Sequence, residues 1–117
     1  MRCFFYQAKI VVKQYKTDEF IECMRSLLSE FRKEKGCPSY SLWRDIEKEN
    51  TYSLAAEWKT HKAMEKHFLT LDFEVLIGAA RVLGDAFEMS ITEIKEKGGY
   101  KLAMRGFKTS SNQATAE

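Results

Sequence analysis

The stretch GCPSYSLWRDIEKENTYSLAAEWKTHKAMEKH, residues 36–67, decides the fold because it holds two strand patterns, the loop between them and the start of a helix. Side chains alternate with the period of a strand over residues 39–46, and again from Thr51 to Trp58. Residues 47–50 between them are charged and lack apolar side chains. We therefore predict two antiparallel strands joined by a hairpin loop.

A helix is predicted to begin after Thr60, whose side chain can accept a backbone hydrogen bond as N-cap. Apolar residues recur on one face of this helix at spacings of three and four, together with a histidine: Ala63, Met64, His67 and Phe68. His67 therefore lies on the apolar side of the helix.

The segments before residue 36 predict a strand followed by a helix. Residues 3–12, CFFYQAKIVV, are rich in aromatic and β-branched residues, which favour a strand. A long helix follows, and Gly36 is placed to take the left-handed conformation after its end. The buried stripe predicted for that helix is Phe20, Cys23, Met24, Leu27, Leu28 and Phe31.

A second helical pattern starts near Asp72 and stops at Gly84, and residues 86–95 alternate as a fourth strand. The predicted order is therefore β-α-β-β-α-β. This order is typical of an α+β, ferredoxin-like domain with a four-stranded antiparallel sheet.

The first strand carries apolar side chains on both faces, and Trp43 lies on the opposite side of its strand from Tyr40. Both helices of such a domain cover the same face of the sheet. We therefore expect the sheet of a second copy to cover the other face, which predicts a homodimer.

A length of 117 residues fits one domain, which we assign to residues 1–97. The remaining residues, 98–117, form a C-terminal extension that begins with two glycines. Alternation over 100–105 predicts an extra short strand at a sheet edge, exchanged across the dimer, and the polar end predicts a disordered tail.

The composition of the chain limits the kinds of binding partner and cellular location that we expect. The 19 Lys and Arg are interspersed with 17 Asp and Glu, so we expect no nucleic acid partner. No apolar run approaches the roughly 20 residues that span a bilayer, and residues 1–13 do not form a signal-peptide core, so we expect a mature protein without a membrane partner. Three cysteines without a paired motif favour reduced thiols and a cytoplasmic location.

The sequence supports neither a metal nor a bound cofactor. His61 and His67 are six residues apart, about 240° around a helix, and cannot ligate one ion. The chain also lacks H-E-x-x-H, a glycine-rich phosphate loop and G-x-S-x-G. We expect no metal, nicotinamide, ATP or serine-hydrolase site.

His67 is the candidate catalytic residue, as a base or hydrogen-bond donor inside an apolar pocket. The alternative is a core histidine that joins helix and sheet. Aromatic side chains that can stack on a planar substrate or donate to a quinol or ketone oxygen, and that can equally be core residues, are Trp58, Trp43, Tyr6, Tyr40 and Tyr52.

The ordered set Gly36-Cys37, Tyr40, Arg44-Asp45, Glu57-Trp58 and His67 resembles the antibiotic biosynthesis monooxygenase family, over roughly residues 3–95. The resemblance implies a ferredoxin-like domain that pairs into a dimeric α+β barrel. It also implies oxidation of a quinol, phenol or related small aromatic by O₂ without a cofactor. The alternative is a non-catalytic small-ligand-binding or stress-response dimer on the same scaffold.

One subgroup of that family degrades haem, and here the chain departs from the subgroup's pattern. That pattern has asparagine on the first strand, tryptophan in place of His67 and histidine in the next helix, where this chain has Gln7, His67 and Ile77. The proximal histidine that would hold haem iron is missing, so we expect no haem.

Overall fold

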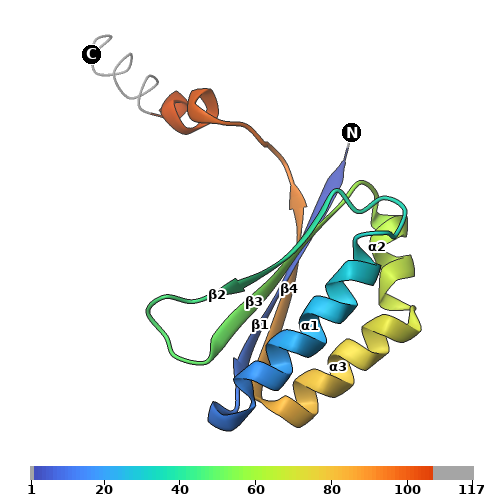
Figure 1. Cartoon of the computed structure of the whole chain (residues 1–117). Coiled ribbons are helices and arrows are strands. Elements are labelled where there is room, and N and C mark those ends of the chain that lie inside the picture. Colours follow the sequence, from blue (N-terminus) through green and yellow to red (C-terminus); the bar gives the residue numbers. More distant parts are fainter. Residues whose placement is uncertain (1, 107–117) are drawn as a thin grey trace.

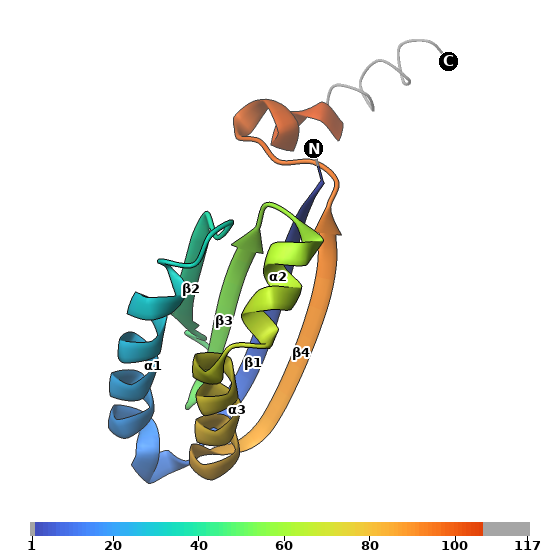
Figure 2. The same cartoon turned by 90° about the vertical axis from the view of Figure 1, so that its right-hand side faces the viewer.

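The structure is a computed structural model that describes residues 2–106. Its elements, in chain order, are β1 (Cys3–Val12), the 3₁₀ turn η1 (Gln14–Lys16), α1 (Thr17–Phe31), β2 (Ser39–Arg44), β3 (Thr51–Trp58), α2 (His61–Phe68), α3 (Leu71–Leu83) and β4 (Gly84–Ile94). The four strands form one antiparallel sheet in the order β2-β3-β1-β4, and the helices lie on one face of it (Figures 1 and 2). The α+β ferredoxin-like prediction is confirmed.

The alternation of β1 places its two faces in different surroundings. Tyr6, Ala8, Ile10 and Val12 are buried under the helices, whereas Gln7 and the other residues between them point to the opposite face. α1 completes the core with buried residues at spacings of three and four, namely Phe20, Met24, Leu27, Leu28 and Phe31. Of the predicted stripe, only Cys23 is partly exposed.

Threonine side chains cap the first turns of α2 and α3. Thr60 Oγ1 accepts a hydrogen bond from the Ala63 N–H at 3.0 Å, and Thr70 Oγ1 accepts one from the Phe73 N–H at 3.1 Å. Gly36 has the predicted left-handed φ, +88°, although α1 already ends at Phe31, and a Cβ at Gly36 would lie 2.8 Å from the Ala63 Cβ. Glycine is therefore required here both by the left-handed backbone and by the close approach of α2.

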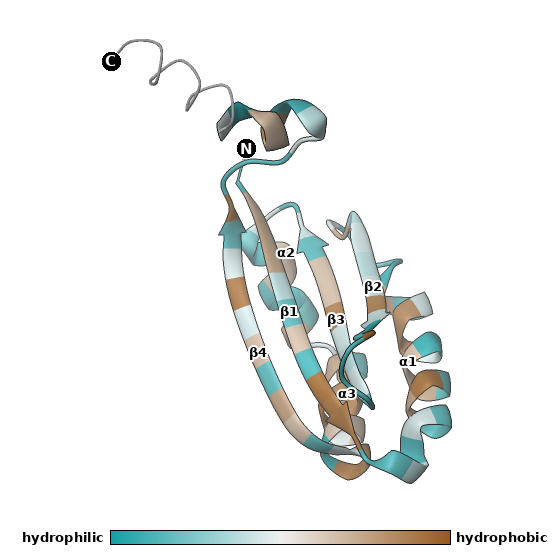
Figure 3. Cartoon of the chain, turned by 90° about the vertical axis from the view of Figure 1, so that its left-hand side faces the viewer, coloured by the Kyte–Doolittle hydropathy of each residue, from teal (hydrophilic) through white to brown (hydrophobic). Residues whose placement is uncertain are grey.

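The face of the sheet without helices is open in a single chain (Figure 3). The strand registers place Phe5 and Val11 on it beside Gln7, Lys9 and small or polar neighbours on β3 and β4. This face is therefore mixed in character, less apolar than the sequence pattern indicates. Pairing with a second copy stays a prediction.

The predicted strand at 100–105 is wrong, because residues 100–106 are helical and lie away from the sheet (Figure 1). The Ala103 N–H donates to the Gly99 carbonyl at 3.1 Å, as in a helix. Lysine, leucine, alanine, methionine and arginine in this segment all favour helix, and six alternating residues are too few to outweigh that propensity. The predicted disordered tail falls on residues 107–117, outside the described residues. Among residues 2–106, no helix is long and apolar enough to cross a membrane.

Candidate functional site

His67 lies at the centre of a buried polar and aromatic cluster between α1, α2 and the sheet. Its side chain is fully buried, although it can carry charge. Glu34 Oε2 lies 2.9 Å from Nδ1, and the hydroxyls of Tyr6 and Tyr40 each lie 3.2 Å from Nε2. The imidazole is thus contacted by polar groups at both nitrogens.

Aromatic rings enclose the imidazole on its remaining sides. Trp58 stacks on it at 4.7 Å between ring centroids, and Phe31 meets it edge-on at 4.7 Å. Phe73 and Phe68 lie at 5.0 and 5.7 Å. This enclosure excludes water from the His67 ring, which strengthens its electrostatic interactions.

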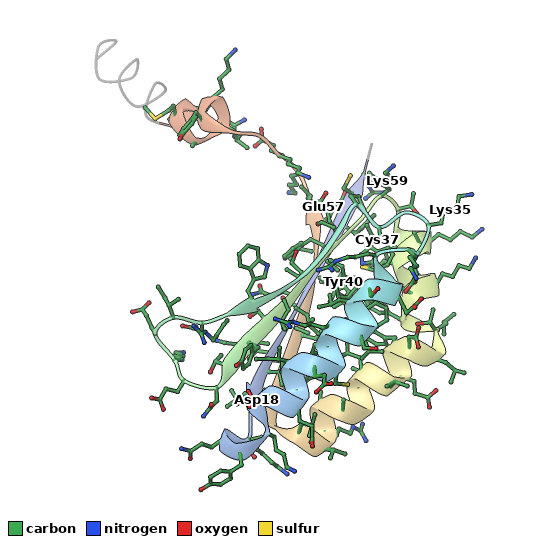
Figure 4. All side chains as sticks on the ribbon, viewed as in Figure 1. Asp18, Lys35, Cys37, Tyr40, Glu57 and Lys59 are labelled. Atoms are coloured by element: carbon green, nitrogen blue, oxygen red, sulfur yellow. The ribbon has the colours of Figure 1, made fainter. Side chains whose placement is uncertain are left out.

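The strand register explains why two tyrosines reach one histidine. Tyr6 on β1 and Tyr40 on β2 both pair with Ala56 of β3, which lies between them on the helix-covered face. The small Ala56 side chain leaves room above β3 for both phenols to lean toward α2. Tyr40 lies at the end of the sheet where α1 ends, opposite the end marked by Asp18 (Figure 4).

Burial lowers the pKa of His67, while the hydrogen bond and charge of Glu34 oppose that shift. The ring is therefore neutral near pH 7. With Nδ1–H donating to the Glu34 carboxylate, Nε2 carries the lone pair and is the basic atom.

Two tyrosine hydroxyls compete for the single acceptor atom of His67. Nε2 has one lone pair, so only one of Tyr6 and Tyr40 can donate to it at a time. Burial raises the pKa of Tyr40, which keeps its proton. The buried Trp58 Nε1 also lacks a hydrogen-bond partner among the described residues. This cluster can therefore accept a guest that brings oxygen acceptors.

Two of the predicted pocket residues do not reach this cluster. Tyr52 lies six residues before Trp58 on β3, about 20 Å along the strand, and packs on Phe20 at 5.2 Å. Trp43 is 62% exposed on the helix-free face, because strand alternation turns it away from Tyr40. Tyr6, Tyr40, Trp58 and His67 are brought together.

Residues that the sequence analysis did not assign to the site are Glu34, Phe31, Phe68 and Phe73. Glu34 approaches His67 across 33 residues of sequence. A local signal did exist in the sequence, because Glu34 follows the buried Phe31 by three positions and so continues the spacing of the apolar stripe past the end of α1. A carboxylate on a buried stripe indicates a buried partner.

A cavity of about 670 Å³ lies next to the cluster and is lined in part by Phe68, Phe73 and Ile77. The rings of Phe68 and Phe73 contact each other at 4.9 Å, and both contact Tyr6, at 5.3 and 6.3 Å. These two phenylalanines thus form the wall between the cavity and the Tyr6–His67 pair.

Two other kinds of chemistry have less support at this site. Across residues 2–106, no group of three or more His, Cys, Asp or Glu side chains is placed to hold a metal ion. Burial, aided by the charge of Glu34, raises the pKa of Cys37 to about 11, which keeps the thiol protonated and a poor nucleophile at pH 7.

The chain is similar to known proteins over most of its length. Residues 4–77 match the model of the antibiotic biosynthesis monooxygenase family. YcnE of Bacillus subtilis (strain 168), whose name provisionally describes a monooxygenase, is 33% identical over 91 residues, which cover 77% of this chain and 96% of YcnE.

Solved structures share the fold. A conserved protein from Methanosarcina mazei Go1 is 27% identical with a TM-score of 0.73, over 83% of this chain and 95% of that chain. SnoaB, a cofactor-independent oxygenase from Streptomyces nogalater solved as a single-residue variant, is 21% identical with a TM-score of 0.69, over 82% and 95% of the two chains. The family match, the identity to YcnE and the shared fold agree, and the chain belongs to the antibiotic biosynthesis monooxygenase family.

Proposed function

We propose that the protein is a cofactor-independent monooxygenase that oxidises a quinol, phenol or related small aromatic with O₂, and that His67 is its catalytic base. The observation that carries this proposal is the buried, neutral His67 with a carboxylate on one nitrogen and tyrosine hydroxyls at the other. Family membership and the cofactor-independent oxygenase named among the structural neighbours support the same reaction class.

In this proposal the aromatic substrate enters the 670 Å³ cavity and displaces the rings of Phe68 and Phe73. Its hydroxyl gives a proton to the Tyr6 oxygen while Tyr6 passes its own proton to Nε2 of His67. The Glu34 carboxylate stabilises the resulting imidazolium. The Trp58 N–H and the second tyrosine hydroxyl are available to the substrate oxygen.

The ionised substrate then supplies the electrons for O₂. One electron moves to O₂, and the two radicals combine so that a C–O bond forms to a ring carbon that bears hydrogen. The peroxide takes a proton from the imidazolium. Loss of that carbon's hydrogen with cleavage of the O–O bond releases water and leaves a quinone carbonyl. One oxygen atom enters the product and the other enters water, so no external reductant is needed.

The alternative is a non-catalytic small-ligand-binding module. It is favoured by the closed state of the cluster, in which Tyr6, His67 and Trp58 are all fully buried. A core of that kind can bind a ligand, and be stabilised by it, without catalysing a reaction.

The test is oxygen uptake with a panel of hydroquinones and phenols in the presence of a chelator. His67→Gln removes the base and keeps side-chain hydrogen bonding. His61→Gln is the control, because His61 is an exposed histidine at the start of the same helix. We expect kcat to fall about 10²–10⁴-fold for His67→Gln and to be nearly unchanged for His61→Gln.

Two results would count against the proposal. Oxygen uptake no faster than buffer for every compound, with ligand binding retained, would support the binding module. If His67→Gln lowers the melting temperature by several degrees but leaves turnover within a few-fold of wild type, His67 belongs to the core.

A further inference from the structure

Four lysines surround a second hollow, of about 460 Å³, at the end of the molecule where α1 ends and α2 begins. Lys35 comes from the segment after α1, Lys59 from the junction between β3 and α2, and Lys62 and Lys66 from α2. Figure 4 shows Lys35 and Lys59 at this same end. All four side chains are exposed, and Gly36 and Ala63 contribute to the lining.

The carboxylates nearest in sequence are all engaged elsewhere. Glu34 contacts His67, Glu57 pairs with Lys97, and Glu65 pairs with His61. Within residues 2–106, Lys35, Lys59, Lys62 and Lys66 make no ion pair. The chain as a whole is nearly balanced, with 19 basic and 17 acidic residues, so this unneutralised group is a local feature.

The hollow is held in shape by backbone contacts. The Lys59 N–H donates to the Gly36 carbonyl at 2.9 Å, which ties the segment after α1 to the start of α2. The left-handed Gly36 leaves no side chain in the space beside Ala63. The lysine stems can line an apolar wall while their ammonium groups stay at the rim.

We propose that this hollow binds a small anionic molecule through a carboxylate or phosphate group, with its apolar part against the lysine stems. Ammonium groups bind phosphate and carboxylate through charge-assisted hydrogen bonds, and an anion relieves the mutual repulsion of the four lysines. A small molecule is favoured over a membrane or nucleic acid, because the charges surround a concavity and do not spread along a face. The inference does not depend on oxidation at His67.

The experiment is a titration of the full chain with phenyl phosphate, followed by ¹H–¹⁵N correlation spectra. We expect shifts centred on the amides of Gly36, Thr60 and Ala63, weaker binding at high salt, and no such shifts with phenol. The double variant Lys35→Glu/Lys62→Glu should weaken binding at least about tenfold, because two attractions become repulsions.

The matched control is Lys13→Glu/Lys48→Glu, which changes the net charge equally with exposed lysines outside the hollow and should bind like wild type. Benzoate in place of phenyl phosphate shows which anion is preferred. Equal loss in both double variants would show a nonspecific charge effect and overturn the site. Binding to anionic lipid vesicles without binding of phenyl phosphate or benzoate would overturn it in favour of a membrane surface.

Discussion

At the residue scale, Glu34 determines which nitrogen of His67 is basic. Its carboxylate holds the proton on Nδ1 and leaves Nε2 free to accept a proton from Tyr6 or the substrate. Glu34 also raises the pKa of His67 against the larger effect of burial, which lowers it. Base strength at this site is therefore set by the balance of these two effects.

Replacing Glu34 by glutamine tests that role as a positioning residue. The amide oxygen can still accept from Nδ1, but the negative charge is gone, so the pKa of His67 should fall further. We expect kcat to fall at least about tenfold and the acid limb of the pH–rate profile to move to lower pH. Glu65→Gln, at the partner of the exposed His61, is the control and should leave both unchanged.

A merely structural Glu34 would give a different pattern. In that case Glu34→Gln would lower the melting temperature without moving the pH–rate profile.

The burial of His67 also predicts how stability depends on pH. Because its pKa is lowered from 6.5 on folding, the unfolded chain binds more protons than the folded chain between the folded-state value and 6.5. The contribution of neutral His67 is therefore fully present above about pH 6.5 and is lost as pH falls toward the folded-state pKa. Urea unfolding from pH 7.5 to 5 should show a steeper loss for wild type than for His67→Gln, and equal slopes would contradict a lowered pKa.

At the element scale, most starts and ends of helices and strands could be predicted because residues close to them in the sequence determine them. Thr60 begins α2 and Gly84 ends α3 as expected, and the period-two pattern of residues 3–12 became β1. The helix at 100–106 could not be predicted from alternation, because the helix propensity of its residues outweighs six alternating positions and, within residues 2–106, no sheet edge pairs with them.

The candidate site was predictable in part for a similar reason. Tyr6, Tyr40 and Trp58 lie on strands whose side chains alternate between two faces, so the sequence shows which face each of them takes. The contact between Glu34 and His67 joins the segment after α1 to α2 across 33 residues, and the spacing of Glu34 after Phe31 indicates a buried partner but not which residue it is. Tyr52 faces the helices as well, but the cluster forms around His67 at the other end of β3, and the sequence alone does not show which end of the strand α2 covers.

Replacing glycine by alanine should change the unfolding free energy in opposite directions at two positions. Gly36→Ala forces a side chain into a left-handed backbone and against Ala63, so we expect a loss of more than about 1 kcal/mol in unfolding free energy. Gly78→Ala adds a methyl group inside α3 with nothing within 4 Å and should gain about 0.5–1 kcal/mol. Urea unfolding measures both, and a neutral Gly36→Ala would contradict the packing of α2 on the segment after α1.

At the scale of the whole molecule, the helix-free face of the sheet is the proposed dimer surface. Phe5 lies on this face, whereas Phe87, 43% exposed, lies on the helix side of β4. Light scattering at micromolar concentration should find a dimer for wild type and for Phe87→Arg, and a monomer for Phe5→Arg, because a charge would be buried in the interface. A monomeric wild type would show that this face needs no partner.

The central claim is that His67 ionises an aromatic substrate before oxygen takes part. It is tested most directly by ultraviolet difference spectra recorded without oxygen, using the hydroquinone or phenol that gives the fastest oxygen uptake. We predict the red-shifted absorption of the ionised phenol bound to wild type at pH 7.5, and the neutral spectrum bound to His67→Gln. An un-ionised ligand on wild type, or equal ionisation on both proteins, would contradict the claim.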